Sequence, residues 1–497
     1  MNALAAKVSQ IKSVFMESPN APNNATAATD RVPLKQKLAY GLGGPVDILA
    51  IWVFVSIAYP VFNMELQMSP TRVAVILMAL RLWDGIADPV MGWISDNTRS
   101  RWGRRRPFIF IGAILAAITY PLIWWFPMDL SHDQLMIWVI GFGILFYTCF
   151  TIWAVPFQSL LMEMTPDYDE RTRVTSIRGI FQSLAGLFNG FCWWLSLRPV
   201  FSMTNEAGEL VPSTINGMRY ISIGVALAIL VLGLLPALFV KERYYTSGLV
   251  KSQKRVSLFK GLKTTLSCGP FLVLCAFTVL FLFGQSIYDN YGRYVGTYYV
   301  LGGDWEKSAL ITSWGTLVYV VFNLIMIPVF ALVSQKIGKN KCLFFASFFF
   351  LFSAILTWYT FTPEQPYLML VNGAFLGVAY AGLWTMLPTM QTDVVDYDEL
   401  KTGARREGSF ASVYSWVLKL SFCTGYLLSG PFLEMTGFDA ALGGEQSSET
   451  LKHLRLGFVF IPMVAVALAI VTLRFFPIDR TKANEIRASL EARRGVL

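Results

Sequence analysis

The sequence predicts an all-α membrane protein with twelve transmembrane helices in two related six-helix halves. First, 55% of its 497 residues are hydrophobic and 15% are charged, with a mean hydropathy of +0.51, unlike an ordinary soluble domain. Second, the chain contains twelve apolar runs of about the 20 residues that cross a bilayer as a helix. Third, one charged tetrapeptide occurs at equivalent places in both halves.

The twelve predicted spans follow one another with polar connections between them. Their ranges are 38–62, 73–95, 108–127, 135–162, 175–200, 218–240, 270–297, 308–335, 343–361, 366–392, 410–436 and 455–476. Residues 1–36 form a predicted N-terminal tail, and residues 477–497 form a predicted C-terminal tail.

Basic residues occur in alternate connections of the predicted bundle. Five arginines lie between spans two and three, and seven Lys or Arg residues lie in 241–269. The connections 128–134, 201–217 and 362–365 contain none. By the positive-inside rule, both tails are cytoplasmic. The net charge of +9 therefore reflects topology, and it does not indicate a nucleic-acid partner.

The repeated tetrapeptide is Asp-Tyr-Asp-Glu, which begins at Asp167 and again at Asp396, 229 residues later. The same offset places the start of a second half near span seven, so the predicted halves are 37–240 and 270–476, joined by a basic cytoplasmic linker at 241–269. Two parallel six-helix repeats are typical of the major facilitator fold, whose site lies between the halves at mid-membrane.

Two classes of function are excluded by what the sequence does not contain. It has no GxxxxGK[ST] phosphate-binding loop, which argues against an ATP-driven pump. Its connections on the predicted outer face leave no room for a catalytic domain, so we expect neither an enzyme nor a bound cofactor.

Two aspartates interrupt the second span, in "LWDGIADPVMGW" (82–93). Asp84 and Asp88 are four residues apart and share one helix face, although a charged group at the bilayer centre costs about 2.5 to 3.5 kcal/mol on insertion scales. Two such carboxylates either share a proton or hold a cation between them. The pair is therefore a candidate coupling site for H⁺ or Na⁺.

Other charges and polar groups within the spans favour a hydroxylated substrate. The further intramembrane charges are Asp47, Arg81, Arg178, Asp289, Arg293 and Lys419, and inter-helix salt bridges are the alternative to a binding role. Hydroxyl groups can bind to the carboxylate of Asp47 and to the amides of Gln158 and Asn189. Flat rings for sugar C–H surfaces are offered by Trp153, Trp384 and Tyr288. Arg178 and Lys419 leave an anionic sugar open.

At these residues the sequence resembles the glycoside-pentoside-hexuronide:cation symporter family, which includes the melibiose permease. The matching segments are "YGLGGPVD" (40–47), "RLWDGIADPVMGWISDNTRSRWGRRRPF" (81–108), "VPFQSL" (155–160), "DYDERTR" (167–173), "LWTMLPTMQTDVVDYDELKTGARREG" (383–408) and "LRLGFVFIP" (454–462). The segment "RWGRRRPF" also resembles the sucrose-transporter branch.

The resemblance implies roles for individual residues. It implies that Asp84, Asp88 and Thr151 serve the cation, and that Asp47 and Trp384 bind the sugar, with Lys419 between the two sites. We add Gln158 and Arg178 to the substrate-binding set from their chemistry.

Three departures from the family pattern bear on the ion and the sugar. Ala87 stands where the sodium-using pattern has an asparagine, which favours H⁺ over Na⁺. Ala154 and Gln158 replace a second sugar-binding aspartate and a tryptophan, which argues against galactoside specificity.

The charged cytoplasmic connections predict an inner gate. Arginines and aspartates of facing connections can form an ionic latch that closes the cytoplasmic side. The candidate residues are Arg101, Arg104, Arg105, Asp167, Asp169, Asp396 and Asp398. The alternative is that the arginines only determine topology.

We therefore predict a monomeric symporter of the bacterial inner membrane that carries a sugar or glycoside inward with H⁺. The alternatives are Na⁺ coupling at Asp84 and Asp88, symport of an amphiphile, and a sugar sensor that does not transport.

Overall fold

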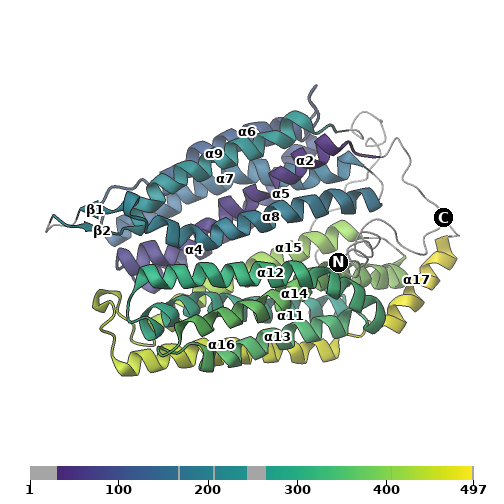
Figure 1. The fold of residues 1–497 in the computed structure, drawn as a ribbon. Coiled ribbons are helices and arrows are strands. Elements are labelled where there is room, and N and C mark those ends of the chain that lie inside the picture. The colour runs from purple at the N-terminus through teal and green to yellow at the C-terminus, as the bar shows by residue number, and fades with distance from the viewer. Residues whose placement is uncertain (1–30, 166–167, 205–207, 243–264, 404–405, 495–497) are drawn as a thin grey trace, which may run out of the picture.

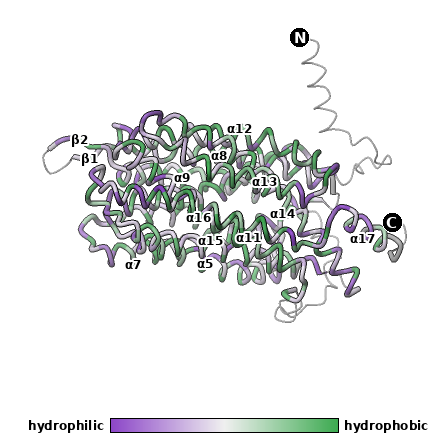
Figure 2. The backbone as a smooth tube through the Cα atoms, turned by 90° about the horizontal axis from the view of Figure 1, so that it is seen from below, coloured by the Kyte–Doolittle hydropathy of each residue, from purple (hydrophilic) through white to green (hydrophobic). Residues whose placement is uncertain are grey.

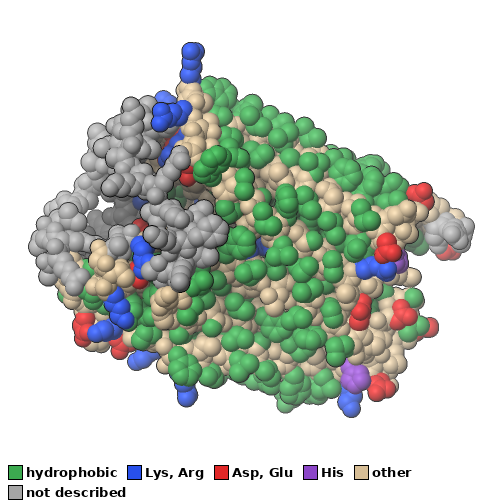
Figure 3. Space-filling model, turned by 180° about the vertical axis from the view of Figure 1, so that it is seen from behind, with side chains coloured by type: hydrophobic (Ala, Val, Ile, Leu, Met, Phe, Trp, Pro, Cys, Tyr) green, Lys and Arg blue, Asp and Glu red, His purple; other side chains and the backbone are tan. Residues whose placement is uncertain are grey.

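The structure is a computed structural model that describes residues 31–165, 168–204, 208–242, 265–403 and 406–494. Long helices run side by side along one axis (Figure 1). Hydrophobic segments fill the body of the molecule and hydrophilic ones gather toward its two ends (Figure 2). Hydrophobic side chains also cover most of the middle of the face in Figure 3. This is the surface expected of a protein embedded in lipid.

Within the described residues, nine helical segments are long and apolar enough to cross a membrane. They are Leu34–Glu65, Arg106–Ile123, His132–Met164, Thr214–Phe239, Gly269–Val300, Trp305–Ile337, Lys339–Thr360, Pro366–Thr402 and Ser448–Phe475. Three further long helices lie at the predicted spans two, five and eleven: α5 (Pro70–Asn97), α8 (Tyr168–Ser196) and α15 (Glu407–Glu434). These three carry many of the intramembrane charges.

The first segment is an irregular helix. Its parts are α2 (Leu34–Gly43), α3 (Pro45–Asp47), η1 (Ile48–Trp52), α4 (Val53–Ala58) and η2 (Tyr59–Glu65), of which η1 and η2 are π-helical. Such wide turns are frequent at functional sites. Asp47 lies directly before η1.

The remaining elements are α-helices, short 3₁₀ turns, one more π-helical segment (η7) and two short strands. In the first part of the chain they are α6 (Arg106–Thr119), η3 (Pro121–Ile123), α7 (His132–Met164), η4 (Pro199–Phe201), β1 (Met203–Thr204), β2 (Leu210–Val211) and α9 (Thr214–Phe239). In the second part they are α11 (Gly269–Tyr294), η7 (Val295–Val300), α12 (Trp305–Ile337), α13 (Lys339–Thr360), η8 (Pro366–Leu368), α14 (Met369–Thr402), η9 (Ala440–Leu442), α16 (Ser448–Thr472), η10 (Leu473–Phe475) and α17 (Arg480–Arg494).

The helices gather in two groups that follow chain order. Those up to α9 lie together in the upper part of Figure 1, and those from α11 onward lie below them. Across the boundary, α5 packs against α15 and α8 packs against α12. The hairpin of β1 and β2 marks one end of the bundle, which we call the hairpin end, and α17 marks the other, which we call the terminal end.

The two groups are joined by polar contacts toward the hairpin end. The Tyr59 hydroxyl lies 2.9 Å from the Ser429 hydroxyl, and the Tyr294 hydroxyl donates to the Asn63 amide oxygen at 2.5 Å. In addition, Arg198 forms an ion pair with Glu306 at 2.6 Å. These contacts hold the two groups together at this end.

Small residues let the helices approach closely across the same boundary. A Cβ atom on Gly190 would lie 2.4 Å from the Thr316 side chain, and one on Gly430 would lie 2.6 Å from the Pro70 carbonyl oxygen. Larger side chains at either glycine would therefore separate the groups.

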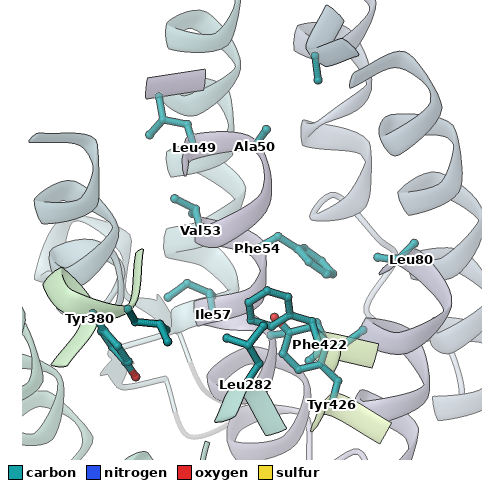
Figure 4. Close-up of a cluster of buried hydrophobic side chains, with 14 of the residues drawn as sticks. Leu49, Ala50, Val53, Phe54, Ile57, Leu80, Leu282, Tyr380, Phe422 and Tyr426 are labelled. Carbon is teal, nitrogen blue, oxygen red and sulfur yellow. The ribbon is translucent and has the colours of Figure 1, made fainter. Parts of the chain in front are cut away.

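An apolar cluster fills the middle of the molecule. Leu49, Val53 and Ile57 follow one another along the first segment, and Phe422 and Tyr426 of α15 lie near the lower end of this column (Figure 4). The rings of Phe422 and Tyr426 stack with centroids 6.1 Å apart. Polar groups next to this cluster are consequently shielded from bulk water.

Two elements were not expected from the sequence. The connection 201–217 contains the short antiparallel pair β1 and β2, and the C-terminal tail contains α17, which packs against α14. Helix ends also extend a few residues beyond the predicted spans, because a helix continues into polar flanking sequence where its backbone hydrogen bonds still form. The helix α14, for example, continues to Thr402 rather than ending at residue 392.

Candidate functional site

A lysine lies between the two aspartates of α5. The Lys419 ammonium of α15 is 2.5 Å from Asp88 Oδ2 and 3.0 Å from Asp84 Oδ2. It also donates to the Asp84 carbonyl oxygen at 2.9 Å. The structure thus brings Lys419, which was predicted to lie between the sugar and cation sites, into contact with both aspartates of the predicted cation pair, more than 300 residues away in sequence.

Two further side chains complete this cluster. Arg81 Nη1 lies 3.4 Å from Asp84 Oδ2, and the Thr151 hydroxyl donates to Asp88 Oδ1 at 3.4 Å. Arg81 also lies over the Phe422 ring, 5.3 Å from its centroid. We call Arg81, Asp84, Asp88, Thr151 and Lys419 the coupling cluster.

The two carboxylates of the coupling cluster have different surroundings. Asp84 is almost fully buried and faces two cations, whereas the Asp88 side chain is 32% exposed and, among the described residues, has only Lys419 as a cationic partner. Balanced pairs of this kind are the stable state for charges removed from water. The exposed carboxylate, Asp88, is the one that an incoming cation can reach.

A second polar site surrounds Asp47. Arg178 Nη2 donates to Asp47 Oδ2 at 2.6 Å, and Gln182 Nε2 donates to the same oxygen at 3.3 Å. Arg178 also lies 5.1 Å from the centroid of the Phe157 ring. A Cβ atom on Gly44 would come within 2.7 Å of the Arg178 side chain, so this glycine allows the first segment to approach α8.

The other predicted substrate residues are dispersed. Trp384 of α14 is 42% exposed, and Gln158 of α7 is exposed. Asn189 accepts a hydrogen bond from Ser56 at 2.8 Å. Their binding roles remain predictions.

Two aromatic residues lie in the core, contrary to the expectation that their faces would be open to a sugar. Trp153 is wholly buried, stacks on Phe157 with centroids 4.5 Å apart, and donates to the Gly233 carbonyl at 3.0 Å. Tyr288 is buried, and its hydroxyl lies 3.4 Å from that of Ser353. The sequence does not predict this burial, because the identity of an aromatic residue in a span does not indicate which side of the helix faces the core.

Two arginines of the predicted inner gate bind acidic residues of their own group. Arg104 and Arg105 reach Glu163 at 2.6 and 3.1 Å, and their backbone N–H groups donate to Glu242 at 2.7 and 2.8 Å. Arg101 is exposed.

The aspartates of the predicted gate are in part beyond the described structure. Asp398 forms an ion pair with Arg406 at 2.5 Å. Asp396 lies in α14. Asp167 and the side chain of Asp169 fall outside the described residues. Gate closure remains a prediction.

Two acidic residues at the terminal end have altered acidity. Burial raises the pKa of the Glu242 carboxyl, although backbone N–H groups favour its charged form. Burial would also raise the pKa of Glu170, but hydrogen bonds from Lys37 and the Val32 N–H, with the positive charge of Lys37, lower it below its usual value. Glu170 therefore binds Lys37 as a carboxylate at 2.6 Å.

Glu163→Gln should destabilise the protein because Arg104 and Arg105 would lose their shared carboxylate. Breaking one partner of a buried ion pair costs about 3 kcal/mol, so we expect a clearly lower melting temperature in detergent. Glu364→Gln changes an exposed acid in the same way and should leave the melting temperature unchanged. Equal melting temperatures for both variants would contradict the structural role of Glu163.

The family of the chain follows from its sequence as a whole. Residues 39–480 match the family described as MFS/sugar transport protein. The chain belongs to this family. It is therefore a multi-pass membrane transporter and not an enzyme, and its resemblance to the cation symporters of sugars is confirmed.

Three relatives named as symporters or carriers are similar to this transporter over most of its length. It is 26% identical to an uncharacterized symporter of Synechocystis sp. over 94% of this chain and 98% of the relative. It is 24% identical to a glucuronide carrier protein homolog of Escherichia coli, over 85% of this chain and 87% of the relative. It is 25% identical to a sodium-dependent lysophosphatidylcholine symporter of Danio rerio, over 90% of this chain and 86% of the relative.

A solved structure agrees with the fold of the transporter. The crystal structure of a D-xylose-proton symporter superposes with a TM-score of 0.62 at 16% identity, covering 90% of this chain and 98% of that one. At this identity the likeness concerns the fold alone.

Several residues of the site were absent from the sequence prediction. Gln182 joins Asp47, and its position four residues after Arg178 was the available signal, because residues four apart share a helix face. Glu163 and Arg406, in contrast, offered no pattern that would identify their partners.

Proposed function

We propose that this transporter carries a sugar or glycoside into the cell together with H⁺ by alternating access. In this proposal twelve transmembrane helices form two halves, 37–240 and 270–476, with the linker 241–269 and both tails in the cytoplasm. The observation that carries the proposal is the position of Lys419 between Asp84 and Asp88, at 3.0 and 2.5 Å.

The position of Lys419 can couple ion binding by the two carboxylates to movement of α15. A proton that binds Asp88 removes one of the two carboxylate partners of the ammonium group, which leaves Lys419 held by Asp84 alone and better able to approach the substrate. A cation from outside and the ammonium group compete for the same oxygens. Ion binding at α5 and the position of α15, which belong to different halves, are linked in this way.

The Asp47 site supports a hydroxylated or acidic sugar. Asp47 offers a carboxylate that can accept hydrogen bonds from two sugar hydroxyls, while Gln182 can both donate and accept. Arg178 is a planar donor suited to a carboxylate, so a uronide would bind where Asp47 now pairs with it at 2.6 Å.

Contacts between the halves support a cytoplasm-facing conformation. The halves are joined toward the hairpin end, for example through Arg198 and Glu306. At the terminal end, ion pairs between described residues join residues of one half, such as Lys37 with Glu170 and Arg406 with Asp398. The ionic latch would form in the opposite conformation.

Equivalent ion pairs support the two-half organisation. In the first half, Arg104, two residues before α6, binds Glu163 near the end of α7 at 2.6 Å. In the second half, Lys339 at the start of α13 binds Asp393 of α14 at 2.6 Å. The two pairs occupy corresponding places in the proposed repeat, at helices three and four and at helices nine and ten.

Symport of an amphiphile is the second candidate, and one feature of the structure favours it. A cavity of about 610 Å³ lies between the first segment, α8 and α9, and its lining is apolar, including Leu42, Leu49, Phe181, Phe188 and Leu232. Such a groove could hold an acyl chain. The likeness to the zebrafish lysophosphatidylcholine symporter agrees with this alternative.

Uptake into energised cells distinguishes the two candidates. Cells that make the protein are given labelled mono- and disaccharides, glucuronides or lysophosphatidylcholine, with and without a protonophore. We expect one sugar class to accumulate and the protonophore to abolish its accumulation. Uptake of the lysophospholipid alone, or accumulation that depends on Na⁺ and survives the protonophore, would contradict the proposal.

A further inference from the structure

One acidic side chain in the middle of the second half belongs neither to the coupling cluster nor to the Asp47 site. Asp289 lies on α11, one turn before Arg293. Arg293 does not bind it but donates to the Ser56 carbonyl of the first segment at 2.6 Å. Within the described residues, no ion pair within 4.0 Å involves Asp289. A salt bridge between helices would be the simpler explanation of this charge. The described residues form no such salt bridge with Asp289.

The Asp289 side chain is exposed, but residues of other helices lie near it. Its side chain is exposed, whereas Tyr288 and Asn290 on either side are buried. It nevertheless lies close enough to interact electrostatically with tyrosines of two neighbouring helices, Tyr319 of α12 and Tyr380 of α14. An exposed carboxylate enclosed by several helices faces the interior between them and not the lipid.

Two buried polar atoms near it have no hydrogen-bond partner among the described residues. Gln285 is one turn before Asp289 and adjoins it, and its amide oxygen has no hydrogen-bond partner, although only 8% of the residue is exposed. The Tyr380 hydroxyl, on a residue that is 7% exposed, also has none. Buried polar groups of folded proteins are almost always hydrogen-bonded, so these two atoms indicate that a ligand or water completes the site.

The chemistry of the site suits a hydroxylated ring. A carboxylate, an amide and a phenol supply several acceptors and donors for hydroxyl groups. The rings of Tyr319 and Tyr380 meet edge to face with centroids 5.6 Å apart, and aromatic rings of this kind contact the C–H surfaces of sugars. Asp289 supplies a negative charge, and the nearby Arg293 already donates to the Ser56 carbonyl, so the site does not favour an anionic group.

The site is displaced from Asp47 along the bundle axis. Asp47 and Ser56 are nine residues apart, or about 13 Å at a rise of about 1.5 Å per residue. Arg293 contacts Ser56, and Asp289 lies about 6 Å back toward the level of Asp47. The two carboxylates thus belong to opposite halves and differ in level by about 7 Å, which suits a substrate longer than one sugar ring.

We propose that Asp289, Gln285 and Tyr380 form a second sugar-binding subsite, which receives the second ring of a disaccharide or glycoside whose first ring binds at Asp47. This inference rests on the proposed sugar transport. It narrows the substrate class to molecules of at least two units.

The test compares binding of disaccharides with binding of their component monosaccharides. Maltose, cellobiose, lactose and melibiose, with glucose and galactose, are titrated into purified wild type, Asp289→Asn and Tyr380→Phe. We expect both variants to lose at least tenfold in affinity for the disaccharide that wild type binds, with less than twofold change for its monosaccharide. Asp289→Glu should recover part of the loss, and Glu364→Gln should behave as wild type.

Each contrary result has a distinct meaning. Equal losses for disaccharide and monosaccharide, or no loss for either, would overturn the second subsite while leaving sugar transport intact. Sugar-driven proton uptake that disappears in Asp289→Asn for every sugar would assign Asp289 to coupling and also overturn the subsite. Wild type that binds none of the sugars but does bind lysophosphatidylcholine would refute the proposed function itself.

Discussion

Asp88→Asn is expected to reach the membrane in normal amount and to lose accumulation of the sugar by about 100-fold. The amide is of the same size but cannot take up a proton, and it cannot neutralise Lys419, which lies 2.5 Å from the carboxylate in the wild type. The carrier should then be unable to use the proton gradient, although it retains the sugar site at Asp47.

Two measurements isolate coupling from folding in this variant. Accumulation in energised cells should disappear, whereas exchange of labelled for unlabelled sugar across the membrane, which needs no gradient, should persist. Asp133→Asn, which changes an exposed aspartate of α7, is the matched control. Accumulation at the wild-type level in Asp88→Asn would refute the coupling role.

Asp47→Ala should weaken sugar binding by about 10- to 100-fold. A hydrogen bond to a charged group contributes about 1.5 to 3 kcal/mol, and the substitution also leaves Arg178 without its partner at 2.6 Å. The dissociation constant of the purified protein measures this loss directly.

A control makes the Asp47 result specific. Asp47→Asn keeps the size of the side chain and one carbonyl acceptor, so it should fall between wild type and Asp47→Ala. Unchanged affinity in both variants would move the sugar site away from the first segment.

The charges within spans were the most informative feature of the sequence. A charge in a membrane is stable only when it faces a partner or water, so Asp84 and Asp88 could be paired before their geometry was known, and the family resemblance placed Lys419 between the cation and sugar sites. Their mutual contacts follow that logic. The helical character of the chain was equally predictable, because a lipid-embedded backbone must satisfy its hydrogen bonds within each helix.

Other parts of the site depend on packing that no sequence pattern expresses. The pairing of Asp47 with Arg178 requires the close approach permitted by Gly44. Asp289 has no ion pair among the described residues, and Arg293 donates to a carbonyl of another helix instead. Trp153 is buried for a similar reason, since its indole N–H donates to the Gly233 carbonyl of α9. Such contacts join residues far apart in the chain, and hydropathy alone does not predict which of these residues will meet.

The most direct test of the central claim, that sugar and H⁺ move together, uses a pH electrode. De-energised cells that make the protein are suspended in weak buffer, and mono-, di- and uronic sugars are added in turn to the wild type and to Asp88→Asn. We predict that the medium becomes more alkaline when wild-type cells receive the transported sugar, and that the variant gives no such change. Labelled sugar that enters wild-type cells without any alkalinisation would contradict proton symport.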